Sequence, residues 1–287
     1  MVQASIGVIG GSGLYQMEEL ADVEQVEVST PFGEPSDVIT VGTLHGVRVA
    51  FLPRHGKGHH ISPAELPARA NIYALKSLGV ERIISISAVG SLKENIHPLD
   101  LVIPDQIIDR TSSRVSTFFG HGLVAHVGLA EPFCPALSRL LSETSGQAGA
   151  SVHHGGTCVV IEGPSFSTRA ESFLYRSWGA SVVGMTTVPE ARLAREAEMC
   201  YATLAFVTDY DCWHHSEEPV TVEMVVTNLQ RSVEVAKTIV KAAVSHIPHQ
   251  RDCACATALK DAIITSPEQI PAYLKKDLAL LIGKYLK

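Results

Sequence analysis

The stretch "ASVVGMTTVPEARLAREAEMCYATLAFVTDYDCW" (residues 180–213) is the clearest indication of the architecture. Residues 180–187 and 201–210 are apolar and rich in β-branched side chains, as in strands that are buried on both faces. Residues 188–199 have helical periodicity and begin with Pro189 and Glu190, which suit a first helical turn. Strands of this type that alternate with helices predict a mostly parallel sheet in an α/β protein.

The same alternation extends along the rest of the chain. Further strands are predicted at residues 5–11, 82–92, 100–109 and 157–163, a hairpin at 37–56, and helices at 62–79, 167–179, about 221–246 and from about 267. The helix at 62–79 is expected to have Ser62 as its N-cap, Glu65 in the capping-box position and Gly79 at its end. We therefore expect a single α/β domain over residues 1–287, with a central mixed, mostly parallel twisted sheet flanked by helices. A variable C-terminal helical tail is expected from about residue 248.

The composition excludes several classes of protein. The chain has 287 residues, of which 46% are hydrophobic and 18% charged, and its net charge is -7. No long basic block is present, so nucleic acid is not an expected partner. No apolar stretch approaches the ~18 residues that a membrane span requires, and the N-terminus does not have the basic and apolar regions of a signal peptide. We expect a soluble, cytoplasmic protein without a membrane partner.

The six cysteines include no CxxC pair, which favours a reducing compartment. Cys253 and Cys255 could form a strained disulfide across one residue, but a short surface segment with two free thiols is the favoured prediction. The histidine pairs at 59–60, 153–154 and 214–215 do not have the spacing of zinc ligands, so no metal site is expected.

Polar residues follow several of the predicted strands, at the edge where ligands bind in open α/β sheets. The glycine group after the first strand is not a dinucleotide fingerprint, because Gln16 stands where the third glycine is required. This argues against a dinucleotide-dependent oxidoreductase. The donor positions at these strand ends are Ser12, Arg54, His55, Ser87 and Thr186. Together they predict a metal-free site for an oxyanion of the size of phosphate.

Asp209 and Asp211 follow the last predicted strand. In an extended chain, side chains two residues apart point to the same face, with Cβ atoms roughly 6–7 Å apart. Two like charges this close repel and raise a pKa. A solvated turn is an equal alternative from these two residues alone. Next to an anion site, however, the pair suits attack of phosphate on a purine nucleoside: Asp209 would hold or deliver the proton at N7, and Asp211 would accept a hydrogen bond from the adenine amine.

Long motifs occur in order between residues 5 and 247, among them "GVIGGSGL", "LPRHGKGHHISP", "IEGPSFSTRAES" and most of the stretch quoted above. They resemble the 5′-methylthioadenosine phosphorylases, which are of the trimeric purine nucleoside phosphorylase type. The resemblance implies the nucleoside phosphorylase fold and a homotrimer. It also implies a pentosyl transfer in purine and methionine salvage: methylthioadenosine and phosphate give adenine and 5-methylthioribose 1-phosphate, with phosphate as co-substrate and no cofactor.

The resemblance also implies residue roles. Phosphate would be held by Ser12, Arg54, His55, Ser87, the backbone of Ala88, and Thr186. Met185 would lie under the ribose, and His126 would reach the 5′ end of the substrate in a neighbouring subunit. Val222 would form part of the apolar pocket for the methylthio group.

Two alternative functions are weighed against this one. The 6-oxopurine nucleoside phosphorylases are also similar, and Ser165 stands where methylthioadenosine enzymes usually carry arginine. Those relatives, which would act on 6-oxopurine nucleosides or methylthioinosine, place glutamate at the position of Ser167 and asparagine at that of Asp209. Both residues here therefore favour adenine. A non-catalytic nucleoside-binding module would be expected to lose Asp209 or the Arg54-His55 pair, and all three are present.

Overall fold

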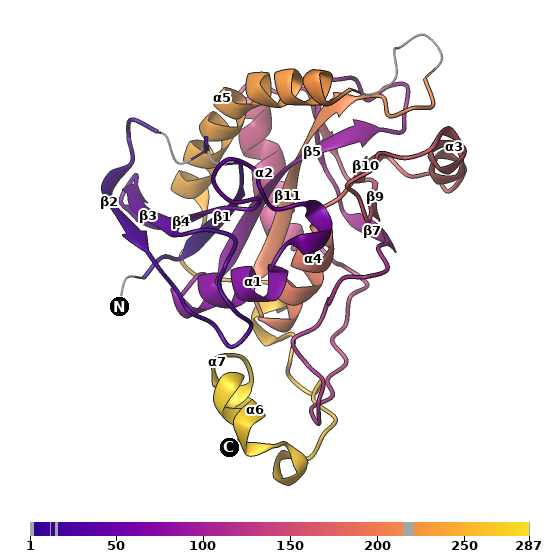
Figure 1. The fold of residues 1–287 in the computed structure, drawn as a ribbon. Helices are drawn as coiled ribbons and strands as arrows, with labels where there is room; N and C mark the ends of the chain where they lie inside the picture. The colour runs from indigo at the N-terminus through magenta and orange to yellow at the C-terminus, as the bar shows by residue number, and fades with distance from the viewer. Residues whose placement is uncertain (1–2, 12, 15–16, 215–220, 287) are drawn as a thin grey trace.

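The computed structural model describes residues 3–11, 13–14, 17–214 and 221–286. Its centre is an eleven-stranded mixed sheet in the order β2-β3-β4-β1-β5-β10-β9-β7, with β11 paired to β5 and β6, and β6 to β8 (Figure 1). The strands are β1 (Ile6–Gly10), β2 (Ala21–Val26), β3 (Ile39–Leu44), β4 (Val47–Pro53), β5 (Arg82–Ser91), β6 (Leu101–Ile103), β7 (Gln106–Arg110), β8 (Val152–His154), β9 (Thr157–Ile161), β10 (Val182–Gly184) and β11 (Cys200–Asp209). Most strand pairs are parallel, and the antiparallel ones are β2–β3, β3–β4, β5–β10 and β6–β11. The predicted fold class is confirmed.

Helices cover both faces of the sheet. They are α1 (Ala68–Ser77), α2 (Pro135–Gln147), α3 (Arg169–Ser177), α4 (Thr187–Glu196), α5 (Val222–His246), α6 (Ala272–Asp277) and α7 (Ala279–Ile282). One hydrophobic cluster packs α1 and α4 against the sheet, and a second packs α2 and α5 against the opposite face (Figure 1). Within the described residues, no helix has both the length and the apolar character needed to cross a lipid bilayer.

Strand β11 shows why the sheet needs a helical layer on each face. All of its residues are buried. Leu204 and Phe206 pack into the cluster with α2 and α5, whereas Tyr201 packs into the cluster with α1 and α4. Alternate side chains of a strand point to opposite faces, so a continuous apolar run fills both layers, as the sequence predicts.

Prolines explain two differences from the predicted elements. The Ser62–Glu65 capping interaction is present, but it closes only a 3-10 turn (Pro63–Glu65) before α1. Pro67 holds Leu66 outside the helical region, at φ -56° and ψ 125°, because a residue before proline disfavours the α conformation. The predicted strand at 100–109 is likewise divided into β6 and β7, with Pro104 between them.

The C-terminal segment (residues 253–286) packs along the loop between β7 and α2, at the lower end of the molecule in Figure 1. Ala125 and Ile263 form an antiparallel bridge, and the backbone N–H of His126 donates to the carbonyl of Ala262 at 2.9 Å. Apolar side chains of the two segments, including Phe118 and Leu274, share one hydrophobic cluster. The C-terminal segment therefore fixes the position of the loop that carries His126.

Candidate active site

Three neighbouring strands place the predicted anion-binding residues at one level of the sheet. Gly10 of β1 is in register with Pro53 of β4, and the N–H of Arg54 donates to the carbonyl of Gly10 at 2.9 Å. On β5, the Ser87 Oγ lies 3.1 Å from the Thr186 Oγ1, which precedes α4. Ala88 is half-buried beside Ser87. The structure thus brings Arg54, Ser87, Ala88 and Thr186 together, while Ser12 lies outside the described residues.

Arg54 is not the open cation that the sequence suggests. Its Nε donates to the Glu190 Oε1 at 2.6 Å, its Nη2 to the Glu190 Oε2 at 3.1 Å, and both side chains are only 3% exposed. The sequence predicts for Glu190 only a place in the first turn of a helix, not an ion pair with Arg54. Burial lowers the pKa of Arg54, but the charge of Glu190 and its hydrogen bonds raise it by more, so the guanidinium is held in its charged form.

The remaining donors of Arg54 are also largely used. Nη2 donates to the Ser85 Oγ at 2.7 Å and Nη1 donates to the Ile86 carbonyl at 2.8 Å. Among the described residues, one Nη1–H has no acceptor. On the other side, the Tyr201 hydroxyl donates to the Glu190 Oε2 at 2.8 Å. Arg54 therefore has one N–H left for a ligand, on a side chain held in a buried network.

His55 lies beside this network in its neutral form. Burial, followed by the charge of Arg54, lowers the pKa of His55 to about 4. Its Nδ1 is 2.8 Å from the carbonyl of Ile61, which can only accept, so Nδ1 carries the proton and Nε2 is an acceptor. The ring is stacked on His59 at 4.2 Å. His55 is thus suited to accept the O–H of a monohydrogen phosphate rather than to donate to a dianion.

Asp209 and Asp211 are buried, each about 6% exposed, so the solvated-turn alternative is wrong. The extended geometry is also wrong: the register shifts between Val207 and Asp209, and Asp211 has φ +51°. The N–H of Asp211 donates to the Asp209 Oδ1 at 2.7 Å, and the Thr208 hydroxyl donates to the Asp209 Oδ2 at 2.7 Å. Gly90 permits this approach, because a Cβ there would lie 2.9 Å from the Asp209 Oδ1.

Both carboxyl groups have raised pKa values. Burial raises the pKa of Asp209, although the Thr208 hydroxyl and the Asp211 N–H partly offset it. Burial raises the pKa of Asp211 to about 6; the Ser172 hydroxyl lowers it in part, and the Asp209 carboxylate raises it. In the part of the chain that the structure describes, the Asp211 Oδ2 and the Ser167 Oγ are buried without a hydrogen bond of normal geometry. Such atoms are suited to a polar ligand.

Met185 directly follows β10 and directly precedes Thr186. It is half-buried, and Arg114 donates to its carbonyl and to those of Val188 and Glu162. Gly163 approaches Met185 closely, since a Cβ there would lie 2.7 Å from the Met185 Sδ. Arg114, which the sequence did not single out, therefore links the Met185 backbone to the end of β9 and the start of α4.

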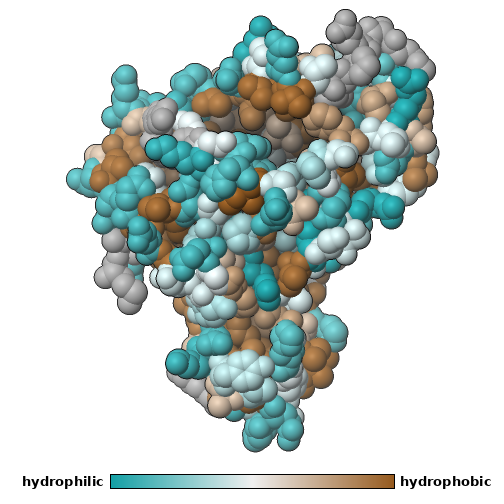
Figure 2. All heavy atoms as spheres, in the orientation of Figure 1, coloured by the Kyte–Doolittle hydropathy of each residue, from teal (hydrophilic) through white to brown (hydrophobic). Residues whose placement is uncertain are grey.

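Two predicted residues are exposed on a single chain. Val222, the first residue of α5, is 68% exposed, and Val226 is 44% exposed. Hydrophobic side chains gather along α5 at the top of the molecule in Figure 2, beside a hollow in the surface. His126 is exposed on the loop beside the C-terminal segment, so the alternative of a buried core histidine is wrong. The alternative that Val222 is an ordinary core residue is also wrong, because its side chain is exposed. Val220 lies outside the described residues.

Comparisons with known proteins agree on one family. Residues 5–245 match the model of the Phosphorylase superfamily. The chain is 56% identical to an S-methyl-5′-thioadenosine phosphorylase of Koribacter versatilis, over 99% of this chain and 97% of the relative. A relative of the same name from Geobacter sulfurreducens is also 56% identical, with 98% and 99% covered.

Solved structures agree with these sequence relatives. The crystal structure of a methylthioadenosine phosphorylase from an antarctic soil metagenomic library has a TM-score of 0.94 and 52% identity, with 98% of this chain and 99% of that chain covered. A variant of the adenosine/methylthioadenosine phosphorylase of Schistosoma mansoni, in complex with methylthioadenosine, has a TM-score of 0.81 and 38% identity, with 87% and 93% covered.

Proposed function

The chain belongs to the S-methyl-5′-thioadenosine phosphorylase family of the Phosphorylase superfamily, and from this we propose that its site catalyses the phosphorolysis of methylthioadenosine. The products are adenine and 5-methylthioribose 1-phosphate, and the reaction is a pentosyl transfer. The observation that carries the proposal for this site is the buried pair of Asp209 and Asp211, both with raised pKa values. Asp209 is in register with Gly90 of β5, the strand that also carries Ser87 with its contact to Thr186.

In the proposed reaction, a phosphate oxygen forms a bond to C1′ as the bond from C1′ to the purine N9 breaks. The Ser87 and Thr186 hydroxyls, the Ala88 backbone and the free Nη1–H of Arg54 orient the phosphate, and Ser12 adds a further donor as the family resemblance implies. His55 accepts the phosphate O–H. Because the donors from Arg54, Ser87, Ala88 and Thr186 are already fixed by the fold, they stabilise the developing charge without reorganisation.

Asp209 handles the proton of the leaving base. A carboxyl group whose pKa is raised stays protonated over a wider pH range, so Asp209 can deliver a proton to N7 as the purine departs. Ionised Asp211 accepts from the N6 amine through Oδ2, which makes no hydrogen bond of normal geometry within the described residues. The Ser167 hydroxyl beside it completes the polar edge that recognises adenine. Adenosine is a second candidate substrate, because the Schistosoma mansoni relative is described as an adenosine/methylthioadenosine phosphorylase.

Release of adenine from methylthioadenosine should depend strictly on phosphate. The measurement is the rate of adenine release with and without phosphate, with melting temperature as a second readout, since a bound co-substrate stabilises the folded state by mass action. Equal release in phosphate-free buffer would identify a hydrolase and contradict the proposal.

We expect a homotrimer in which His126 and Val222 contribute to sites shared between subunits. Their exposure on a single chain supports this, because a substrate pocket normally buries its apolar lining. Light scattering at assay concentrations should give three chains per particle. A fully active monomer would refute the assembly.

Replacing Val222 by Asp should weaken the preference for methylthioadenosine over adenosine. Loss of one contact of the size of a methylthio group costs about 1–3 kcal/mol of discrimination. The side chain is exposed on the single chain, so its fold should persist. The ratio of kcat/KM for the two nucleosides is the measurement, and Val23→Asp, at another exposed valine, is the control. An unchanged ratio in Val222→Asp counts against this role.

The free state of all six cysteines is consistent with a reducing compartment, and a cytoplasmic location remains a prediction.

A further inference from the structure

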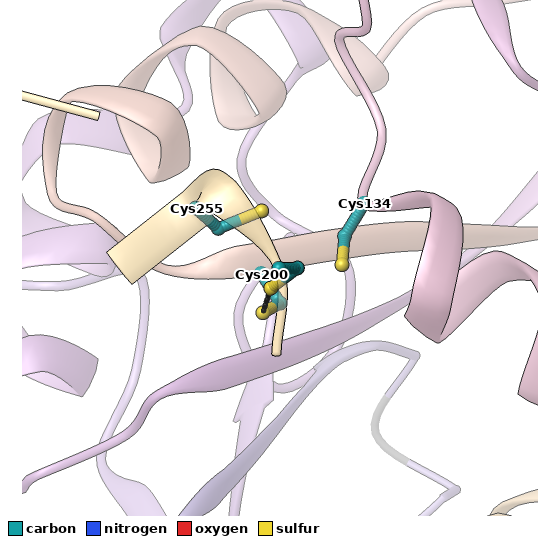
Figure 3. A group of neighbouring side chains, drawn as sticks. Cys134, Cys200 and Cys255 are labelled. Atoms are coloured by element: carbon teal, nitrogen blue, oxygen red, sulfur yellow. Dashed lines mark hydrogen bonds between the residues drawn. The ribbon is translucent and has the colours of Figure 1, made fainter. Parts of the chain in front are cut away.

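Four cysteines from three distant segments meet away from the carboxyl pair. Cys134 precedes α2, and Cys200 begins β11. Cys253 precedes the 3-10 turn Ala254–Thr257 at the start of the C-terminal segment, and Cys255 lies within it. Figure 3 shows the sulfur atoms of Cys134, Cys200 and Cys255 around a common space. All four Sγ atoms lie within 4.8 Å of one another. We call these residues the thiol cluster.

The dimensions of the thiol cluster are close to those of a tetrathiolate metal site. Four sulfur atoms around Zn²⁺, each at about 2.3 Å, lie about 3.8 Å from one another. The Cys200 and Cys253 Sγ atoms are 3.3 Å apart and no two of the four are farther apart than 4.8 Å, so a tetrahedral arrangement needs only small side-chain movements. Disulfide-bonded sulfur atoms lie at about 2.05 Å, and the cysteines here are free.

The surroundings also suit a closed structural site. Cys134, Cys200 and Cys255 are almost fully buried, whereas Cys253 is half-exposed and leaves a path for entry. The backbone around the ligands is fixed, since the N–H of Cys134 donates to the Tyr201 carbonyl at 2.8 Å.

We propose that the thiol cluster binds one Zn²⁺ ion as a structural site that fastens the C-terminal segment to β11 and α2. Binding releases the four thiol protons and fills all four metal positions with sulfur, so no position is left for water or substrate. The proposal departs from the expectation that the chain has no metal site. The structure itself corrects a second expectation: Cys253 and Cys255 do not lie together on the surface, since Cys255 is buried. The sequence did not reveal the site because its ligands are 53 or more residues apart except within the CxC pair.

The site has a consequence for the loop that carries His126. The segment after Cys255 holds that loop through the Ala125–Ile263 bridge and the hydrogen bond from His126 to Ala262. A metal at the start of the segment would limit its movement, and so that of the loop. Loss of the metal should therefore increase amide hydrogen exchange in residues 118–128 and 255–265 more than in β1 or β5.

The test uses the full chain, purified under reducing conditions without chelator. Elemental analysis should give about one zinc per chain. After removal of the metal, titration with Co²⁺ should produce the sulfur-to-cobalt charge-transfer and visible bands of a tetrahedral tetrathiolate, and Zn²⁺ should abolish them. Zinc should also raise the melting temperature of the metal-free protein.

Variants locate the metal. Cys253→Ser and Cys255→Ser should each weaken metal affinity by at least the roughly 10–100-fold that follows loss of an outer-shell partner. Cys158→Ser, at a buried cysteine in another hydrophobic cluster, should retain the metal. Reduced protein that binds neither ion, or retains full metal in both cluster variants, overturns the proposal. If the cysteines are isolated as disulfides, the protein is first reduced, and the same Co²⁺ and Zn²⁺ titration then tests whether the thiols bind metal. No readout depends on phosphorolysis, so the two proposals can fail separately.

Discussion

Replacing Asp209 by Asn should lower kcat for methylthioadenosine by about 10²–10⁴-fold, the usual contribution of a general acid or base. The amide keeps the shape of the carboxyl group and can still accept from the Asp211 N–H through one oxygen. The loss should therefore appear in catalysis rather than in folding. The asparagine can also donate to the O6 of a 6-oxopurine, which a carboxylate cannot, so relative activity on methylthioinosine should rise.

Asp211→Asn is the matched control because it removes a carboxylate of equal burial two residues away. It should raise KM for methylthioadenosine more than it lowers kcat, since Asp211 accepts a hydrogen bond from the adenine amine and does not transfer the proton to N7. The measurement is kcat and KM for amino- and oxopurine substrates in both variants. An Asp209→Asn enzyme with unchanged kcat and unchanged base preference would show that Asp209 is not the proton carrier.

Replacing Glu190 by Gln should destabilise the protein by about 3–5 kcal/mol, because it leaves the buried charge of Arg54 without its counterion. Glutamine still offers an oxygen to the Tyr201 hydroxyl, so the missing charge is the main change. Thermal or denaturant unfolding measures the effect. Activity measured below the melting temperature should show a raised KM for phosphate, because Arg54 loses the contacts that orient its free N–H.

A double variant separates stability from function. Arg54→Met together with Glu190→Gln removes both charges and should recover part of the lost stability, since a buried ion pair can often be replaced by neutral groups at little cost. It should not recover the affinity for phosphate, because the oriented N–H is gone. If Glu190→Gln alone is as stable as the parent, the pair is not the buried anchor described here. If the double variant uses phosphate normally, Arg54 has no part in binding it.

The sequence predicts those elements whose local pattern is strong. The continuous apolar run of β11 predicts a buried strand, and the periodicity of α3 and α5 predicts helices; the structure has all three. The predicted hairpin is formed by β3 and β4, with its turn at His45-Gly46. Strand β2, whose residues are almost all exposed, and helix α2 were not predicted. An exposed edge strand has little alternation of apolar and polar residues from which it could be recognised.

Long-range pairs in the site could not be predicted from local patterns. Arg54 and Glu190 are 136 residues apart, and in sequence Glu190 looks like an ordinary acid at the start of a helix. The turn at Asp209 was within reach, however, because an aspartate often accepts from the backbone N–H two residues on. That pattern is present in Asp209-Tyr210-Asp211, and it explains why the two carboxyl groups do not have the spacing of an extended strand.

The most direct test of the account is the fate of the phosphate oxygen. Methylthioadenosine is converted with ¹⁸O-labelled phosphate in unlabelled water, and the sugar product is analysed by mass spectrometry and ³¹P NMR. Because phosphate is the proposed nucleophile at C1′, each adenine released should be matched by one methylthioribose 1-phosphate in which the oxygen between C1′ and phosphorus carries the label. Free methylthioribose with an unlabelled oxygen from water at C1′ would contradict it.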